Sequence, residues 1–114
     1  MRIDSYSFGS IVIDGKTYRD DIIVSANKLI PNWWREEGHS LTVGDIKEII
    51  DRKCKVLVVG TGYSGVMDIP LKTRQGIESL GIELIVEKTS EAVKTYNKLL
   101  EDGREVTGAF HLTC

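Results

Sequence analysis

The stretch at residues 56–59, Val-Leu-Val-Val, most strongly constrains the fold of this chain. Four consecutive apolar residues leave no polar side for solvent, so a strand formed here has to be buried on both faces. Cys54 begins the same segment, and we predict a strand over residues 54–59. A strand buried on both faces needs elements packed above and below its sheet, which is the arrangement of α/β proteins.

Helical and strand-like patterns alternate after residue 42. Thr42, with Asp45 three positions later, predicts a helix start with a partial capping box, and this helix should end near Lys53. Pro70 favours a first helical turn and predicts a second helix over residues 70–80. A third helix should be capped by Thr89 or Ser90 and end at Gly103, and further strands are expected at 82–86 and 106–112. The residues expected to face inward are Val43, Ile46, Ile49 and Ile50, then Leu71, Ile77 and Leu80, then Ala92, Val93, Tyr96, Leu99 and Leu100.

The N-terminal region predicts a β-hairpin. Residues 5–14 read as one strand with a bulge at Gly9-Ser10, Asp14-Gly15 as a two-residue turn, and residues 17–24 as the returning strand. The whole chain therefore predicts a three-layer α/β fold, in which a mixed central β-sheet is flanked by helices and an N-terminal β-hairpin is added. The strand order stays open, and the last strand can run antiparallel to its neighbours.

Length, charge and hydropathy limit the classes of function. A chain of 114 residues predicts a single domain over residues 1–114. The net charge is −2 and no basic face is visible, so we expect no nucleic-acid partner. We also expect no membrane span, because no window approaches 18 consecutive apolar residues. Two cysteines without an export signal indicate a reduced, cytoplasmic protein.

The strand at 54–59 runs into Gly60-Thr61-Gly62-Tyr63-Ser64-Gly65, which has the spelling Gly-x-Gly-x-x-Gly of a dinucleotide-binding turn. In that motif a helix begins inside the glycine turn and holds the pyrophosphate. Pro70 argues against such a helix, so residues 60–69 are expected to form a loop and no cofactor is predicted. The glycines and hydroxyls of this loop leave open a small-molecule or anion site, with a tight structural turn as the alternative.

A second candidate segment is the irregular stretch at residues 25–41, which contains Trp33, Trp34, Arg35 and His39. Tryptophan and arginine are enriched in binding hot spots, and a histidine can exchange protons near neutral pH. One tryptophan is expected to fill the core beneath the loop. Arg35, Thr61, Ser64 and His111 are expected to be neighbours if this stretch folds over the glycine turn.

The two histidines and two cysteines do not have the spacing of a metal site. His111 and Cys114 form a single pair three residues apart, and neither Cys54 nor Cys114 has a second cysteine nearby. We therefore predict no metal site. Cys54 reads as a small core residue, and the role of Cys114 stays open.

Several local motifs, taken in order, resemble one known family. They are residues 6–11 (YSFGSI), 15–21 (GKTYRDD), 33–35 (WWR) with Gly38-His39, 60–62 (GTG), 89–93 (TSEAV) with Tyr96-Asn97, and 111–114 (HLTC). Together they resemble the Mth-like family of small α/β domains of unknown function, which includes an adipogenesis-associated protein and a mitochondrial assembly factor for respiratory complex I. The resemblance covers essentially the whole chain. It implies the same three-layer fold and no established catalytic residues.

The resemblance and the missing catalytic set favour a non-enzymatic module that binds another protein, in the manner of an assembly factor. The alternative is a small-molecule or anion site, with or without catalysis, at the glycine loop. The candidate binding residues are Trp33, Trp34, Arg35, His39, Gly60, Thr61, Gly62, Tyr63, Ser64 and His111.

Overall fold

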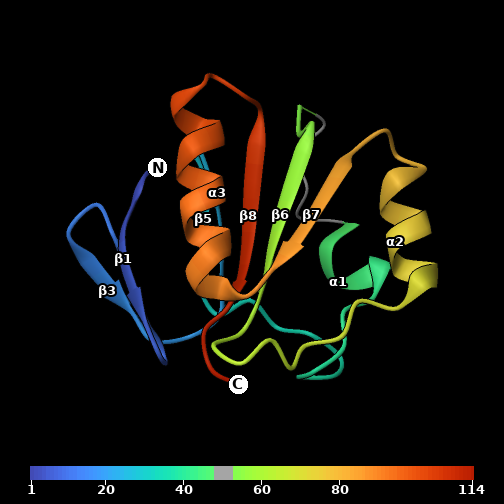
Figure 1. The fold of residues 1–114 in the computed structure, drawn as a ribbon, viewed down its shortest axis with the longest axis horizontal. Helices are drawn as coiled ribbons and strands as arrows, with labels where there is room; N and C mark the ends of the chain where they lie inside the picture. Colours follow the sequence, from blue (N-terminus) through green and yellow to red (C-terminus); the bar gives the residue numbers. More distant parts are fainter. Residues whose placement is uncertain (48–52) are drawn as a thin grey trace.

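The computed structural model describes residues 1–47 and 53–114. Two β-sheets and three helices make up this part of the chain (Figure 1). The three-stranded sheet has the order β1-β2-β3, and the five-stranded sheet has the order β5-β4-β8-β6-β7. The predicted helix over 42–53 is described only as far as Lys47, and its expected inward residues Ile49 and Ile50 lie outside the described residues.

The N-terminal sheet consists of β1 (Ile3–Ser7), β2 (Ser10–Ile13) and β3 (Lys16–Tyr18), all antiparallel. Asp14 and Gly15 form the predicted turn, with φ angles of 50° and 77°. The predicted bulge at Gly9-Ser10 was wrong. Gly9 has a φ of 74° and lies in a turn, because Ser7 pairs with Ser10, so residues 5–14 belong to two strands.

The predicted returning strand over 17–24 is also divided. Its first part is β3, and its second part is β4 (Ile22–Ser25), which leaves the hairpin and enters the five-stranded sheet. The remaining strands of that sheet are β5 (Leu29–Ile30), β6 (Val56–Thr61), β7 (Glu83–Glu87) and β8 (Val106–His111). β6 is parallel to β7 and to β8, whereas β4 is antiparallel to both β8 and β5, so the sheet is mixed as predicted.

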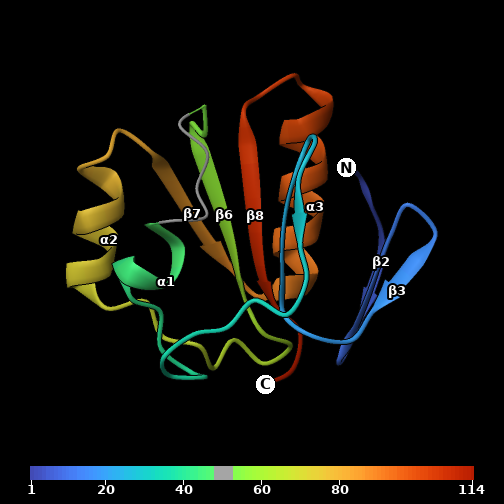
Figure 2. The same cartoon turned by 180° about the vertical axis from the view of Figure 1, so that it is seen from behind.

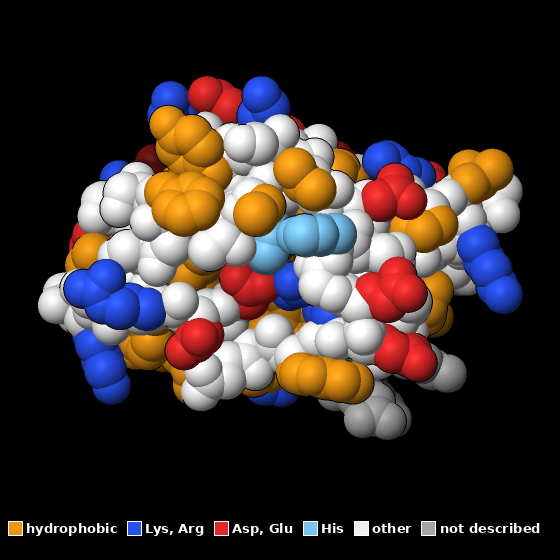
Figure 3. Space-filling model, turned by 90° about the horizontal axis from the view of Figure 1, so that it is seen from below, with side chains coloured by type: hydrophobic (Ala, Val, Ile, Leu, Met, Phe, Trp, Pro, Cys, Tyr) orange, Lys and Arg blue, Asp and Glu red, His pale blue; other side chains and the backbone are white. Residues whose placement is uncertain are grey.

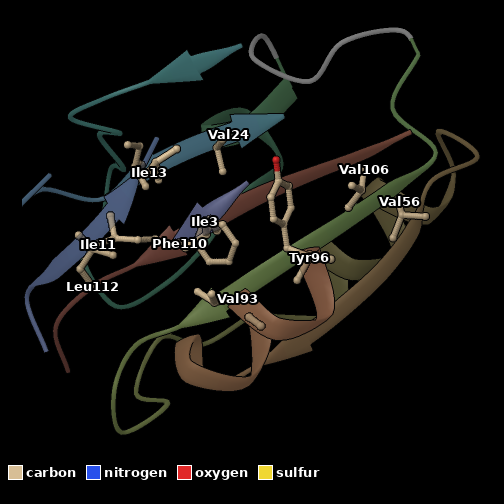
Figure 4. Packing of buried hydrophobic residues seen from close by; sticks show 13 residues of the cluster. Ile3, Ile11, Ile13, Val24, Val56, Val93, Tyr96, Val106, Phe110 and Leu112 are labelled. Carbon is tan, nitrogen blue, oxygen red and sulfur yellow. The ribbon is translucent and has the colours of Figure 1, made fainter. Parts of the chain in front are cut away.

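One face of the five-stranded sheet is covered by α3 (Thr89–Glu101) and by the N-terminal sheet. Figure 4 shows the core on this face, where Tyr96 of α3 and Phe110 of β8 lie beside Ile3, Ile11 and Ile13 of the N-terminal sheet. The rings of Tyr96 and Phe110 pack edge to face, with centroids 5.9 Å apart. Their burial joins the N-terminal sheet to the main sheet in one apolar core.

The opposite face of the sheet carries α1 (Val43–Lys47), α2 (Leu71–Glu78) and the long segment between β5 and α1 (Figure 2). Its core includes Trp33, Leu41, Ile46 and Ile77. The carboxylate of Asp45 accepts a hydrogen bond from the Thr42 backbone at 2.9 Å, which is half of the predicted capping box. With helices and loops on both faces, the three-layer α/β prediction is confirmed.

Two details of the predicted helices were wrong. Leu71 and Leu80 are exposed, because α2 instead buries Thr73, whose hydroxyl donates to the Leu41 carbonyl at 2.7 Å. Thr89 does not cap α3 through its side chain. Its hydroxyl is directed to β8, where it donates to the His111 carbonyl at 2.6 Å.

Candidate functional site

The candidate residues gather at one end of the five-stranded sheet, where β6 and β8 terminate. Thr61 ends β6, His111 ends β8, and these two residues are paired in the parallel register. Figure 3 views this end and shows the histidine side chains together near the centre, beside a recess with acidic and basic side chains at its floor. Residues 31–41 pass over this end of the sheet, so the predicted meeting of this segment with the strand ends does occur.

A charged cluster of Asp21, Arg35 and His111 forms the centre of the site. Arg35 Nη2 lies 2.7 Å from Asp21 Oδ2, and His111 Nδ1 lies 2.7 Å from the same oxygen. The second carboxylate oxygen, Oδ1, accepts a hydrogen bond from the Leu112 backbone at 2.8 Å. The side chains of Arg35 and His111 are only 4% and 6% exposed. Such a buried charge network stays folded only when its members are paired.

The hydrogen atoms of this cluster can be assigned by counting donors. Arg35 Nη2 carries two hydrogens, and these bind Asp21 Oδ2 and the Gly38 carbonyl, the latter at 2.8 Å. The 3.2 Å approach of Nη2 to His111 Nδ1 is therefore not a further donation from Arg35. Because the carboxylate is only an acceptor, His111 Nδ1 carries the proton and donates it to Asp21.

Asp21 is held in its charged form. Burial by itself would raise the pKa of this carboxyl group, but the hydrogen bonds from His111, the Leu112 backbone and Arg35 outweigh it. The pKa of Asp21 therefore lies below the ordinary value of 3.8.

Aromatic rings enclose the cluster. The Arg35 guanidinium lies over the Trp33 ring, with Cζ 4.7 Å from the centroid, and Trp33 Nε1 donates to the Asp45 carbonyl at 3.2 Å. Trp33 is 6% exposed, so the prediction that one tryptophan fills the core beneath the loop is confirmed. The exposed His39 ring packs edge to face against His111, with centroids 5.8 Å apart.

The glycine loop binds another part of the same chain. The backbone N–H groups of Ser64 and Val66 donate to the Cys114 main-chain oxygen, both at 3.1 Å, and Tyr63 N–H donates to the Thr113 carbonyl at 2.7 Å. Gly62 N–H donates to the Thr89 hydroxyl at 2.8 Å. These are the amides that would hold a phosphate in a dinucleotide motif, and here residues of this chain accept their hydrogen bonds.

The loop prediction for residues 60–69 is confirmed beyond the end of β6, since α2 begins only at Leu71. Gly60 itself lies in β6, where its missing side chain leaves room for Thr89 of α3 and Phe110 of β8. Gly62 has a φ of 106° and packs against the backbone of residues 113–114. The structural-turn alternative for this motif therefore accounts for its glycines.

The structure brings together Trp33, Arg35, His39 and His111 but not all the predicted residues. The Thr61 hydroxyl is directed away from the cluster, toward the Glu87 carbonyl at 3.1 Å. Ser64 is exposed in the glycine loop. Sequence reasoning missed Asp21, and the available signal was an acidic residue immediately before the buried segment Ile22–Val24.

Exposed aromatic side chains surround the same end of the molecule. Trp34 is 76% exposed, and Phe8 and Tyr63 are 59% and 57% exposed. The rings of Phe8 and Tyr63 pack edge to face, with centroids 5.8 Å apart. Val66, in the glycine loop, is half exposed. We call Phe8, Trp34, Tyr63 and Val66 the apolar rim.

Two searches of the structure concern metals and membranes. Among residues 1–47 and 53–114, no group of three or more His, Cys, Asp or Glu side chains is arranged to hold a metal ion. In the same residues, no helix is long and apolar enough to cross a membrane.

Known structures resemble this fold over nearly its full length. A conserved hypothetical protein from Pyrococcus horikoshii OT3 is 26% identical, with complete coverage of both chains and a TM-score of 0.76. A protein from Bartonella henselae described as an outer membrane protein is 24% identical, with 98% and 94% of the two chains covered and a TM-score of 0.81. A Mth938-like domain from Bordetella pertussis is 17% identical, covers 97% of this chain and 85% of its own, and has a TM-score of 0.78.

The family model described as "Protein of unknown function (DUF498/DUF598)" matches residues 3–111. The match extends from the first residue of β1 to the last residue of β8, so it includes both sheets, all three helices and the charged cluster. This chain belongs to the DUF498/DUF598 family of proteins of unknown function.

Proposed function

We propose that this chain is a non-enzymatic, cytoplasmic module that binds another protein through the end of the sheet bearing the apolar rim. The exposure of Trp34 is the observation that carries the proposal. Trp34 is 76% exposed although its neighbour Trp33 is buried, so the backbone presents one ring to the core and the other to solvent. Large exposed aromatic side chains of this kind are the residues most often found at binding hot spots.

The segment that presents Trp34 is rigidly attached. Trp33 N–H donates to the Asp21 carbonyl at 2.8 Å, and Arg35 is fixed by its ion pair with Asp21. The residues on both sides of Trp34 are therefore buried and bonded, which limits the conformational entropy lost when a partner covers the indole.

The charges around the rim indicate the chemistry of the partner. The exposed acidic side chains of the surrounding loops are Asp20, Glu36, Glu37 and Asp68. Figure 3 shows acidic side chains spread over this end, alongside separate hydrophobic groups. A partner segment that combines apolar and basic side chains would complement this surface. Assembly factors of the kind implied by the family resemblance hold such a segment of a protein until its complex is complete.

The alternative, anion or small-molecule binding at residues 60–65, has less support. The amides of Tyr63, Ser64 and Val66 already donate to main-chain oxygens of residues 113–114. A ligand at this loop would have to displace these hydrogen bonds before it gained any.

The test compares three purified proteins as baits in extract of the source organism: wild type, Trp34→Ala and Leu80→Ala. Leu80 is 54% exposed on the segment after α2 and is the matched control for loss of a surface apolar side chain. We expect a protein retained by wild type and by Leu80→Ala, with at least tenfold lower recovery on Trp34→Ala, since a hot-spot truncation costs about 2 kcal/mol or more. Equal recovery on all three baits, or none on any, would contradict the proposal.

A further inference from the structure

Three buried polar atoms of the charged cluster have no hydrogen-bond partner among the residues that the structure describes. They are Arg35 Nε, Arg35 Nη1 and His111 Nε2. A buried donor or acceptor without a partner costs about 1–3 kcal/mol, and more when the group is charged. Three such atoms in adjoining side chains indicate that the cluster is shaped to bind a further polar group.

The unpartnered atoms of Arg35 form one edge of its guanidinium. Asp21 and Gly38 occupy the hydrogens of Nη2, so the edge formed by Nε and Nη1 remains. This pair of parallel N–H groups matches the two oxygens of a carboxylate. His111 Nε2 is close to that edge, because Nη2 and Nδ1 are 3.2 Å apart and each unpartnered atom belongs to the same guanidinium or imidazole.

The proton on Nδ1 decides what the third atom requires. Since Nδ1 donates to Asp21, Nε2 of the neutral ring is an acceptor. A carboxyl group that arrives with one proton satisfies the whole set. Its oxygens accept from the two Arg35 nitrogens, and its proton is shared with His111 Nε2.

The charges of the cluster agree with a single negative charge on the ligand. The titratable or charged groups that hydrogen-bond or stack with His111 in the described part of the chain are Asp21, Arg35 and His39. Asp21 and Arg35 balance each other. A proton on His111 would then be balanced by a monoanion, whereas a dianion would leave an uncompensated buried charge.

A hollow of about 350 Å³ reaches the cluster from outside. Asp21 and Trp33 line it, and both of these residues contact Arg35 directly. Arg19 and Asp20 also line the hollow and carry opposite charges, so the entrance does not repel an anion. We propose that Arg35 and His111 form a binding site for a small monocarboxylate, which is taken up together with one proton through this hollow.

The experiment uses nuclear magnetic resonance on ¹⁵N-labelled full-length protein, following Arg35 Nε–H and the His111 ring nitrogens. Sodium acetate and sodium formate are the probes, and sodium chloride and potassium phosphate at equal ionic strength are the comparisons. We expect saturable changes with acetate or formate at pH 6. The affinity should fall about tenfold for each pH unit above the ordinary histidine pKa near 6.5, because one proton accompanies the ligand.

Two variants locate the site. His111→Gln removes the proton-accepting nitrogen and should weaken acetate binding at least tenfold and abolish its pH dependence. His39→Gln removes the exposed neighbouring ring and should bind acetate as the wild type does. Equal changes with chloride and acetate in the wild type would overturn the proposal, and this comparison does not depend on whether a variant folds. Acetate binding that persists unchanged in His111→Gln, or wild-type Arg35 and His111 signals that acetate leaves unmoved, would do so as well.

Discussion

Arg35 Nη2 lies 2.7 Å from Asp21 Oδ2, and this ion pair joins the segment over the sheet to the residue that precedes β4. Because the Arg35 side chain is 4% exposed, removing its partner would strand a buried positive charge. We predict that Asp21→Asn lowers the free energy of unfolding by about 3–5 kcal/mol. Chemical denaturation with urea measures this change.

A surface ion pair provides the control. Arg2 and Glu101 also form an ion pair, but their side chains are 57% and 55% exposed. Arg2→Ala should therefore change the free energy of unfolding by less than about 1 kcal/mol. Similar losses from Asp21→Asn and Arg2→Ala would show that the buried cluster contributes nothing special to stability.

The lowered pKa of Asp21 predicts how stability depends on pH. A carboxyl group whose pKa is lower in the folded state stabilises the fold above its unfolded pKa, near 3.8, and loses this contribution as the pH falls through the folded value. The wild type should therefore lose stability in acid more steeply than Asp21→Asn, and their unfolding free energies should converge toward pH 2. Parallel curves between pH 2 and pH 6 would contradict the assigned cause.

The Gly62 backbone predicts a strong effect of a single methyl group. Gly62 has a φ of 106°, and a Cβ atom here would collide with the Cys114 carbonyl carbon and the Thr113 carbonyl oxygen. Gly103 has a φ of 78° but no atom within 4 Å of its Cβ position. Gly103→Ala should thus cost only the conformational term of about 1–2 kcal/mol. Gly62→Ala should cost clearly more, as measured by thermal and urea unfolding, and equal costs would remove the packing argument.

The Thr89 hydroxyl joins three elements of the site and can be tested by a matched pair of variants. It donates to the His111 carbonyl at 2.6 Å and accepts from Gly62 N–H at 2.8 Å. Thr89→Val keeps the shape but leaves both partners unsatisfied, which should cost about 2–5 kcal/mol. Thr89→Ser keeps the hydroxyl and should cost less. A larger loss for Thr89→Ser than for Thr89→Val would mean that methyl packing, not hydrogen bonding, dominates.

Local chemistry predicted those elements whose limits are set by a few adjacent residues. Pro70 excluded a helix within the glycine turn, and α2 does begin after it, at Leu71. Asp14-Gly15 predicted its turn because both residues adopt positive φ angles readily. The four apolar residues at 56–59 predicted a central strand, and all four are fully buried in β6.

The strand order and the cluster depend on contacts that no local pattern encodes. β4 pairs with β8 across most of the sequence, and either orientation of β8 would bury the same side chains. Asp21 and His111 are 90 residues apart, so their hydrogen bond becomes visible only when β4 and β8 are adjacent. Leu71 and Leu80 were misplaced because apolar periodicity ignores that a threonine can be buried when a carbonyl accepts its hydroxyl hydrogen.

The two adjacent tryptophans predict opposite optical behaviour. Trp33 is 6% exposed and packs against Arg35, whereas Trp34 is 76% exposed. Trp34→Phe should leave a protein whose emission is blue-shifted and weakly quenched by iodide, and whose stability is within about 0.5 kcal/mol of wild type. Trp33→Phe should leave red-shifted, strongly quenched emission and a loss of stability, because the smaller ring leaves space beneath the guanidinium. If both variants quench equally, the two rings do not divide between core and solvent, and Trp34 loses its place as the centre of a binding surface.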